Sequence, residues 1–310
     1  MKRPFTILYR LAAFLSAVLV VMGCQVVKWQ KTSAERKVIR HGFQSHRLVK
    51  DGFDIHFWKG GNGPTVLFLH GFGGDGLTTW KEEMLAIAEN YTVIVPDLLW
   101  FGESSYVGEA NLTSQSKAIE LLLSELKVEQ LTLVGQSYGG FIALDYFLNH
   151  SEQISKLIFA NCPGHTFNYD ELNPVCNNFK VATIEELFVF DEPEKLQRLY
   201  DLAAYKSITV PQSVLKQTFE LYFNDHLEEK RQLLRSLPGE KEHFETTFKP
   251  NITCHVVWGE QDELFSLSSG ERFARTIDGN FHVLKNCGHA PQLDNRKAFT
   301  RLISELIGNE

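Results

Sequence analysis

The sequence has few cysteines, and none of them has metal-binding spacing. Its five cysteines are scattered over 310 residues, with no C-x-x-C pair and no histidine–cysteine cluster. Nothing in the pattern therefore predicts a metal site. Low-complexity tracts and repeats are also missing, and glycine and proline are near ordinary levels at 22 and 10 residues. These properties exclude collagen-like, coiled-coil and disordered chains.

The chain also lacks an excess of positive charge. It has 31 basic and 38 acidic residues, a formal net charge of −7, and a hydrophobic fraction of 44%. Because an acidic surface is a poor match for nucleic acid, we expect no nucleic-acid partner. The length and hydrophobic fraction predict one large globular domain with room for a small inserted layer.

Acidic residues are absent from residues 1–23, which have the layout of an export signal. Basic residues come first, an apolar run follows at residues 11–22, and small residues end the segment. The run is shorter than the roughly 20 residues that span a bilayer comfortably. The last four residues, Val21-Met22-Gly23-Cys24, resemble the bacterial lipobox, which implies acylation of Cys24 and membrane association in the cell envelope. Cleavage without acylation and an uncleaved N-terminal anchor are the alternatives.

The other four cysteines are even in number, which is weak support for disulfides in an exported chain. Cys254 and Cys287 are expected at opposite ends of neighbouring strands, too far apart to bridge. Only a bond between Cys162 and Cys176 stays open.

Apolar runs alternate with amphipathic segments along most of the chain. Strands are predicted at residues 65–69, 92–95, 131–134, 154–160, 252–258 and 281–284, after a hairpin at 45–48 and 53–58. Helices are predicted at residues 78–89, 114–126, 138–149, 267–277 and 296–307. Strands that are apolar on both faces and alternate with helices require a parallel sheet covered on both sides, so the fold class is α/β.

One interval contains no convincing strand. Between Pro163 and Pro250 the sequence shows only amphipathic helical segments, around residues 183–188, 194–205, 212–223 and 227–237. The predicted organisation is an export signal at 1–23, a polar linker at 24–44, an α/β core at 45–162 and 250–310, and a helical cap at 163–249.

A nucleophile motif follows the predicted strand at residues 131–134. Gly135-Gln136-Ser137-Tyr138-Gly139 lies between that strand and a helix. This is the setting of the G-x-S-x-G elbow, in which the serine occupies a strained turn and Gly135 and Gly139 leave room for crowded backbone. The motif predicts Ser137 as a nucleophile.

A base and an acid follow the last two predicted strands. His289 lies in a loop after the strand at 281–284, and Asp262 lies in a loop after the strand at 252–258. The order Ser137, Asp262, His289 is the one expected of a sheet whose catalytic loops gather at the carboxyl ends of its strands. Glu260, Glu263 and Asp294 are the other acids close to these positions.

Donors for an oxyanion are predicted in the loop after the first parallel strand. His70-Gly71-Phe72-Gly73 has glycines that expose backbone amides, so the amides of Phe72 and Tyr138 form the expected pair. His70, Gly71 and Gly73 are expected to support the loop. The segment lacks the spacing and lysine of a phosphate-binding loop.

These motifs together resemble the α/β-hydrolases of the lipase/esterase type, over roughly residues 45–308. The resemblance implies a mostly parallel sheet covered by helices and a helical cap over the active site. The serine at the elbow is unlike the aspartate of haloalkane dehalogenases and most epoxide hydrolases. One departure stands at residues 96–104, where Leu99 and Trp100 replace the usual proline and glycine; we expect it to reshape one wall of the site.

The resemblance implies a serine hydrolase that cleaves carboxylic esters without a cofactor, as a monoacylglycerol-type lipase or a carboxylesterase. The predicted cap is rich in aromatic residues and leucine, which suits an acyl chain or simple packing of the cap. The expected partner is a small or lipid-like ester, and the oligomeric state stays open. A carbon–carbon bond hydrolase of the same fold and an inactive envelope binding protein are the alternatives.

Overall fold

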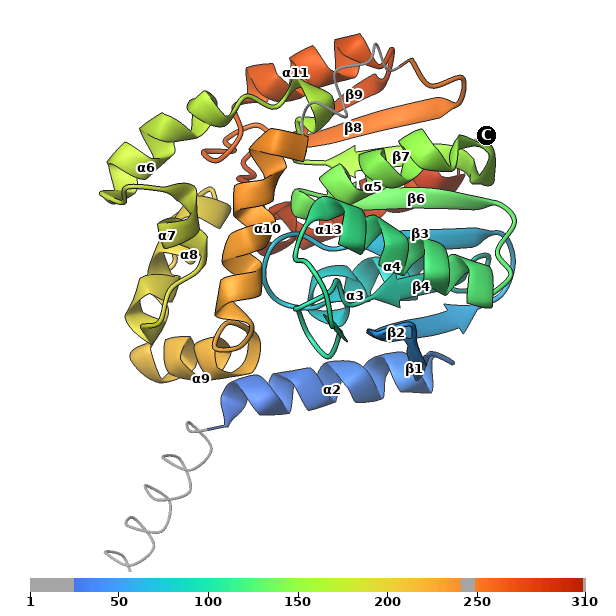
Figure 1. Cartoon of the computed structure of the whole chain (residues 1–310), viewed down its shortest axis with the longest axis horizontal. Coiled ribbons are helices and arrows are strands. Elements are labelled where there is room, and N and C mark those ends of the chain that lie inside the picture. Colours follow the sequence, from blue (N-terminus) through green and yellow to red (C-terminus); the bar gives the residue numbers. More distant parts are fainter. Residues whose placement is uncertain (1–24, 241–248, 309–310) are drawn as a thin grey trace, which may run out of the picture.

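A nine-stranded sheet forms the centre of the molecule (Figure 1). The last strand in the sequence lies at one side of this sheet. The computed structural model describes residues 25–240 and 249–308, so the predicted signal and Cys24 lie outside the described residues. The strand order is β1-β2-β4-β3-β6-β7-β8-β9, with β5 paired to β2. The strands are β1 (Gln44–Lys50), β2 (Phe53–Gly61), β3 (Thr65–Leu69), β4 (Thr92–Pro96), β5 (Ser105–Tyr106), β6 (Leu131–Gln136), β7 (Ile154–Ala160), β8 (Thr253–Gly259) and β9 (Asn280–Leu284).

Six strands of the sheet, from β4 to β9 in spatial order, run parallel. Strand β2 is antiparallel to β1, to β4 and to β5. The carboxyl ends of the parallel strands therefore meet at one edge, where the predicted site residues follow β3, β6, β8 and β9. The α/β-hydrolase architecture expected from the sequence is confirmed.

Helices cover both faces of this sheet, as its two-sided apolar strands require. One face packs α3 and α13 in a cluster that includes Trp80 and Phe299, and the other packs α4, α5 and α11 in a larger cluster that includes Ile142 and Phe273. The helices are α3 (Gly76–Ile87), α4 (Leu112–Glu125), α5 (Tyr138–Asn149), α11 (Leu267–Thr276), α12 (Pro291–Asp294) and α13 (Arg296–Gly308), with a 3₁₀ turn, η1 (Ser151–Gln153), before β7.

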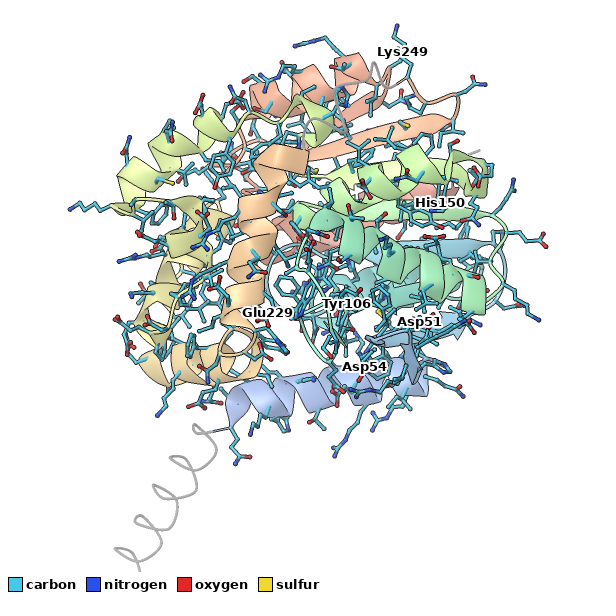
Figure 2. The ribbon with its side chains drawn as sticks, viewed as in Figure 1. Asp51, Asp54, Tyr106, His150, Glu229 and Lys249 are labelled. Carbon is cyan, nitrogen blue, oxygen red and sulfur yellow. The ribbon has the colours of Figure 1, made fainter. Side chains whose placement is uncertain are left out.

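The β1–β2 hairpin turns at Asp51, which adopts a left-handed φ of 52° and lies in the lower half of the view in Figure 2, away from Lys249 at the top. Arg47 and Asp54 pair across its two strands, with Nε and Oδ1 2.6 Å apart. The hairpin places β1 at the side of the sheet opposite to β9.

The segment between β7 and β8 contains only helices among its described residues, which exclude 241–248. It stands beside the sheet as a separate layer at the left of Figure 1. Its own small core consists of Phe190, Leu196, Leu215 and Phe219. The elements are η2 (Gly164–Thr166), η3 (Tyr169–Leu172), α6 (Asn173–Phe179), α7 (Ile184–Phe188), η4 (Pro193–Lys195), α8 (Leu196–Ala203), α9 (Gln212–Tyr222) and α10 (Leu227–Glu240). We call this layer the cap.

The structure corrects the expected polar linker at residues 24–44. Residues 26–40 form a helix, α2 (Val26–Arg40), which runs from the β1–β2 hairpin to the cap helix α9 (Figure 1). Val38 is fully buried beside Trp58 and Trp80, and the amide of Val27 donates to Gln217 Oε1 at 3.1 Å. The sequence predicts a linker here because the segment is mostly polar, and only two of the fifteen helical residues are buried. Helix α2 thus joins the core and the cap.

The Cys162–Cys176 bond that the sequence left open is absent. Cys162, Cys176, Cys254 and Cys287 are all buried free thiols. Cys162 packs against Gly140 at the start of α5, whereas Cys176 belongs to α6 in the cap. Burial raises the pKa of the Cys162 thiol to about 12, so it stays protonated and inert at neutral pH.

Within residues 25–240 and 249–308, none of the helices combines the length and the apolar character that crossing a membrane would need.

Candidate active site

Ser137 occupies a sharp turn between β6 and α5. Its φ of 49° and ψ of −117° lie outside the ordinary regions for a residue with a side chain. Hydrogen bonds hold the turn on both sides, from Ser137 N to Ala160 O and from Gly140 N to Ser137 O, each 2.9 Å. The strain is tolerated because a Cβ is missing at Gly139, where it would overlap the carbonyl oxygens of Leu69 and His70. Gly135 is equally close to the backbone of α5.

The structure brings Ser137, His289 and Asp262 into one hydrogen-bonded line. His289 Nε2 lies 2.9 Å from Ser137 Oγ, and His289 Nδ1 lies 2.9 Å from Asp262 Oδ2. A carboxylate can only accept, so Nδ1 carries the proton and Nε2 accepts from the Ser137 hydroxyl. The imidazole is therefore oriented to receive the serine proton.

Asp262 is held by more than His289. Its side chain is fully buried, and Oδ1 accepts from the amides of Leu264 at 2.9 Å and Phe265 at 3.0 Å. Its other oxygen, Oδ2, also accepts from Asn161 Nδ2 at 2.7 Å. The four donors satisfy the buried charge and fix the carboxylate plane.

Asn161 is a site residue that the sequence reasoning missed. It follows β7 at the same edge of the sheet, is fully buried, and adopts a left-handed φ of 49°. Its position directly after a predicted strand is the one signal that could have found it, because no motif surrounds it.

The neighbouring acids have other contacts. Asp294 accepts from the amides of Gly288 and Tyr205, which ties the His289 loop to the cap. Glu260 accepts from the side chain of Gln261, and Glu263 is exposed. Of the four acids considered, Asp262 is the one that the structure places against His289.

His70 ties together the loops after β3 and β4. Its Nδ1 donates to Gly71 O at 2.8 Å, and its Nε2 accepts from the amide of Leu98 at 2.9 Å. Burial lowers the pKa of His70, and the neutral tautomer is the one that can accept from an amide. His70 has no hydrogen bond to the Ser137 line in the part of the chain that the structure describes.

The loop after β3 approaches the elbow closely. A Cβ on Gly71 would lie 3.3 Å from the Cβ of Ser137, and Gly73 adopts a φ of 105° that favours glycine. The ring of Phe72 meets Tyr138 edge-on at 5.7 Å and Phe188 of the cap at 5.8 Å between centroids. Tyr138 begins α5, at the end of the helix from which the backbone amides point outward. The backbone of Phe72 and Tyr138 therefore borders Ser137 from two sides.

Two buried carboxylates, Asp97 and Asp75, hold the start of α3, which follows this loop. Asp97 Oδ1 accepts from Gly76 N at 2.9 Å, and its Oδ2 accepts from His56 Nδ1 at 2.8 Å. Burial acts to raise the pKa of Asp97, but the hydrogen bond and charge of His56, together with His70 and the amide of Glu103, outweigh it and the pKa is lowered. Burial and the nearby Asp97 raise the pKa of Asp75, the N-cap of α3, to about 6.

The unusual residue in the segment 96–104 does not reach the site. Trp100 adopts a left-handed φ of 66°, the conformation for which glycine is normally preferred, and its side chain is buried beside Tyr106. No residue of 96–104 lines the pocket described next. The expectation that this departure reshapes a wall of the site is therefore wrong, because the ring turns into the core.

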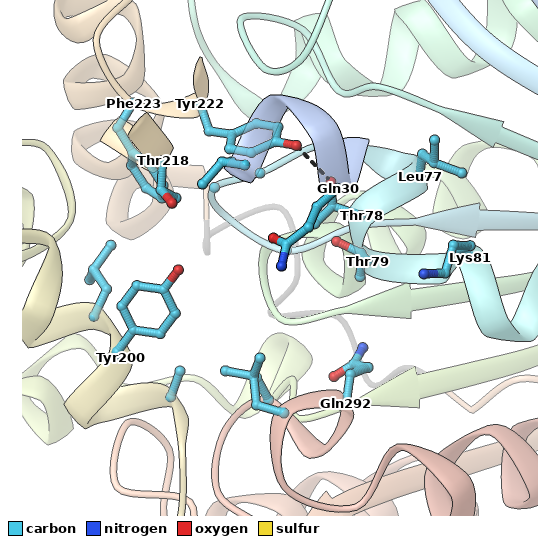
Figure 3. A pocket seen from close by; sticks show the side chains of 18 of the residues that line it. Gln30, Leu77, Thr78, Thr79, Lys81, Tyr200, Thr218, Tyr222, Phe223 and Gln292 are labelled. Carbon is cyan, nitrogen blue, oxygen red and sulfur yellow. Dashed lines mark hydrogen bonds between the residues drawn. The ribbon is translucent and has the colours of Figure 1, made fainter. Parts of the chain in front are cut away.

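Ser137 and His289 open into a pocket of about 670 Å³ between the core, the cap and α2. Apolar cap side chains form one side, with Phe188 from α7, Leu199 from α8 and Phe223 after α9 among them. Figure 3 shows Tyr200 of the cap on one side and Thr79 and Lys81 of α3 on the other. The volume suits a ligand of drug or lipid size.

Gln136 and Gln292 both line this pocket and pair through their amides. Each Nε2 donates to the other Oε1, at 3.1 and 2.6 Å. The pair joins the elbow strand to the segment after His289, and neither residue was predicted from the sequence.

No group of three or more histidine, cysteine, aspartate or glutamate side chains in residues 25–240 and 249–308 is arranged to hold a metal ion. The arrangement offers instead an oriented hydroxyl, a base and backbone donors, the parts needed for attack on a carbonyl carbon.

One family of known proteins matches most of this chain. The model of the alpha/beta hydrolase fold family matches residues 64–296, most of the chain. The protein is an α/β-hydrolase. The matched span includes the elbow, the His70 loop, Asp262 and His289, and it includes the cap as well.

Individual relatives of this α/β-hydrolase have different activities. A 2-hydroxy-6-oxononadienedioate/2-hydroxy-6-oxononatrienedioate hydrolase of Cupriavidus pinatubonensis is 27% identical over 276 residues, covering 84% of this chain and 94% of its own. The monoacylglycerol lipase ABHD6 of Mus musculus is 24% identical over 262 residues, covering 80% and 77%. The similarity supports a hydrolase and leaves the class of bond open.

Solved structures share the fold. The crystal structure of a membrane phospholipase A, titled a novel bacterial virulence factor, superposes with a TM-score of 0.75 at 22% identity, covering 99% of this chain and 98% of its own. At that identity the likeness concerns the fold alone.

Proposed function

We propose that the protein is a serine hydrolase that cleaves carboxylic esters, with Ser137 as nucleophile, His289 as base and Asp262 as the orienting acid. The observation that carries the proposal is the continuous line from Ser137 Oγ through His289 to Asp262, with both bonds at 2.9 Å and the serine among the residues that line a pocket. A serine hydroxyl is a weak nucleophile unless such a base accepts its proton.

In the first half of the reaction, Ser137 Oγ attacks the ester carbonyl carbon while His289 Nε2 takes the hydroxyl proton. The negative charge that develops on the carbonyl oxygen is stabilised by the amides of Phe72 and Tyr138. Collapse of the intermediate breaks the bond to the alcohol, which leaves with the proton from His289, and an acyl-enzyme remains.

In the second half, His289 removes a proton from water as the water oxygen attacks the acyl carbon. The bond to Ser137 breaks, the serine regains its proton, and a carboxylic acid leaves. Asp262 stays ionised throughout and stabilises the imidazolium that forms in each half.

The substrate side of the proposal is a lipid-like or small acyl ester. The cap presents phenylalanine and leucine side chains to the pocket, and burial of an acyl chain against them is favourable by about 25 cal/mol per Å² of apolar surface. A monoacylglycerol is an example, consistent with the lipase among the relatives.

A fluorophosphonate probe tests the nucleophile, because it forms a covalent bond only with an activated serine. We expect labelling of the wild-type protein and none of a folded Ser137→Ala variant. A wild-type protein that is folded and unlabelled would overturn the proposal and favour the inactive binding protein. Among active hydrolases, p-nitrophenyl esters of increasing chain length test the lipid preference: rates that never exceed the acetate rate would contradict it.

Carbon–carbon bond hydrolysis is the second candidate, since the relative from Cupriavidus pinatubonensis covers most of this chain. The same three residues can serve that reaction. A vinylogous 1,5-diketone acid that turns over at least tenfold faster than any p-nitrophenyl ester, by kcat/KM, would favour the carbon–carbon bond hydrolase.

We also propose export and acylation at Cys24, from the lipobox-like residues before it. Helix α2 begins at Val26, two residues after Cys24, and its first residues line the pocket. An acyl anchor there would hold the pocket close to a membrane. Metabolic palmitate labelling should depend on Cys24, and unchanged labelling of Cys24→Ala would contradict the proposal.

A further inference from the structure

The charge on the pocket wall is opposite in sign to the charge of the protein. Although the chain has a net charge of −7, the pocket around Ser137 is lined by four lysine and arginine residues and by no aspartate or glutamate among the described residues. These four are Lys31, Lys37, Lys81 and Arg296, from helices α2, α3 and α13.

Three of these cations converge on one carboxylate. Lys37 Nζ lies 3.2 Å from Glu82 Oε2, Lys81 Nζ lies 3.2 Å from Glu82 Oε1, and Arg296 Nη1 lies 3.9 Å from the same oxygen. Glu82 itself does not line the pocket. One carboxylate thus pairs with three cations, and the three cationic residues, unlike Glu82, line the pocket.

Glu82, the shared carboxylate, is ionised at neutral pH. Burial acts to raise the pKa of Glu82, but the bonds from Lys37 and Lys81 outweigh it and lower the pKa. Lys31 differs from the other three cations because Glu103 and Glu35 lie 3.3 and 3.8 Å from its Nζ. Lys37, Lys81 and Arg296 instead share Glu82 as their one ion-pair partner among the described residues.

The cations and the apolar cap side chains occupy different sides of the pocket. Lys81 lies across the pocket from Tyr200, with Gln30 between them (Figure 3). If an acyl chain packs on the cap, the other half of the ester extends toward α2, α3 and α13. That half meets positive charge.

We propose that the pocket selects esters whose alcohol half carries an anionic oxygen group, a phosphate or a carboxylate, which Lys37, Lys81 and Arg296 hold. The inference rests on the proposed ester hydrolysis and adds the chemistry of the leaving half. Charge-assisted bonds to such a group position the ester as well as attract it.

Matched substrates with one lauroyl chain test the inference: 1-lauroylglycerol, lauroyl lysophosphatidic acid and O-lauroyl lactate, each below its micelle concentration. The readout is the kcat/KM of each anionic ester divided by that of the neutral ester. In Lys37→Gln/Lys81→Gln we expect this ratio to fall about tenfold or more, since each partly exposed cation contributes up to about fivefold. Selectivity for the phosphate, the carboxylate or both identifies the anion.

Two further variants sharpen the result. Lys216→Gln removes an exposed cation on α9 that does not line the pocket, and its ratio should match that of the wild type. Glu82→Gln removes the shared counter-charge, so its ratio should rise. A ratio in the lysine double variant within twofold of the wild type, or a wild type that prefers the neutral ester, overturns the inference and leaves ester hydrolysis untouched.

A binding measurement separates this inference from the proposed function. In the Ser137→Ala background, calorimetry with dodecyl phosphate should give an affinity that falls about tenfold or more when Lys37 and Lys81 are replaced by glutamine. If the Ser137→Ala protein binds dodecyl phosphate equally well with and without the two lysine substitutions, the inference is overturned, and no turnover is needed to show it. Absent fluorophosphonate labelling would instead count against the proposed reaction.

Discussion

Asn161 offers a quantitative test of how the candidate acid is positioned. Its Nδ2 donates to the same oxygen of Asp262 that accepts from His289, at 2.7 Å. Because the residue adopts a φ of 49°, Asn161→Gly removes the amide without backbone strain, whereas Asn161→Ala adds about 1–2 kcal/mol of strain. The two variants therefore separate the hydrogen bond from the conformation.

The expected loss follows from the bonds that remain. A hydrogen bond to a charged group contributes about 1.5–3 kcal/mol, and three of the four donors to Asp262 stay in place in the glycine variant. We expect kcat to fall about 10- to 100-fold, since about 1.4 kcal/mol corresponds to a factor of ten. KM should change little, because Asn161 does not line the pocket.

Steady-state hydrolysis of p-nitrophenyl butyrate measures kcat and KM, and thermal denaturation measures stability. The glycine and alanine variants should lose the same activity, while the alanine variant melts at the lower temperature. A folded glycine variant with kcat within twofold of the wild type, or a loss confined to KM, would refute the positioning role.

Three further predictions concern stability and the elbow. Burial and the adjacent His282 lower the pKa of His255 from 6.5 to about 4, so the unfolded chain takes up the proton first. Stability should fall by about 1–2 kcal/mol between pH 7 and pH 4, after discounting for partial solvent access, and His255→Gln should lessen the fall in thermal melts. Asp75→Asn keeps the helix cap and removes a buried charge whose pKa is about 6, so it should stabilise the fold at pH 8 by up to about 3 kcal/mol in urea titrations, with no gain below pH 4. Gly139→Ala forces a Cβ into backbone carbonyls and should slow fluorophosphonate labelling at least about 100-fold, whereas Gly74→Ala, which has a positive φ but open space, should cost only about 1–2 kcal/mol of stability; equal labelling of both would show that the elbow tolerates the contact.

The sheet could be predicted because its strands are short, continuous and apolar. The segments at 65–69 and 154–160 match β3 and β7 residue for residue. Central parallel strands are buried on both faces, so their ends coincide with the ends of the apolar runs. Ser137, His289 and Asp262 could be predicted because each lies in a glycine-containing turn or loop that follows such a strand.

Helix α2 could not be predicted from hydrophobic periodicity. Val27 and Val38, its two buried residues, are three turns apart, and apart from the half-buried Ala34 the positions between them are polar or exposed. Packing at its two ends stabilises the helix. Hydrophobic periodicity reveals a helix only where apolar residues form a continuous stripe along one face. The cluster of cations around Glu82 could not be predicted for a related reason. Lys37, Lys81 and Arg296 are distant in sequence, and only the fold brings them to one carboxylate.

The position of α2 has a practical consequence for truncation. A shortened chain that starts at β1, prepared to improve solubility, would lose the pocket wall that carries Lys31 and Lys37. It would also uncover the apolar surface around Trp58 and Trp80 that Val38 now occupies. Such a fragment would aggregate more readily, and its substrate profile would describe a wider and less cationic pocket than that of the full-length protein.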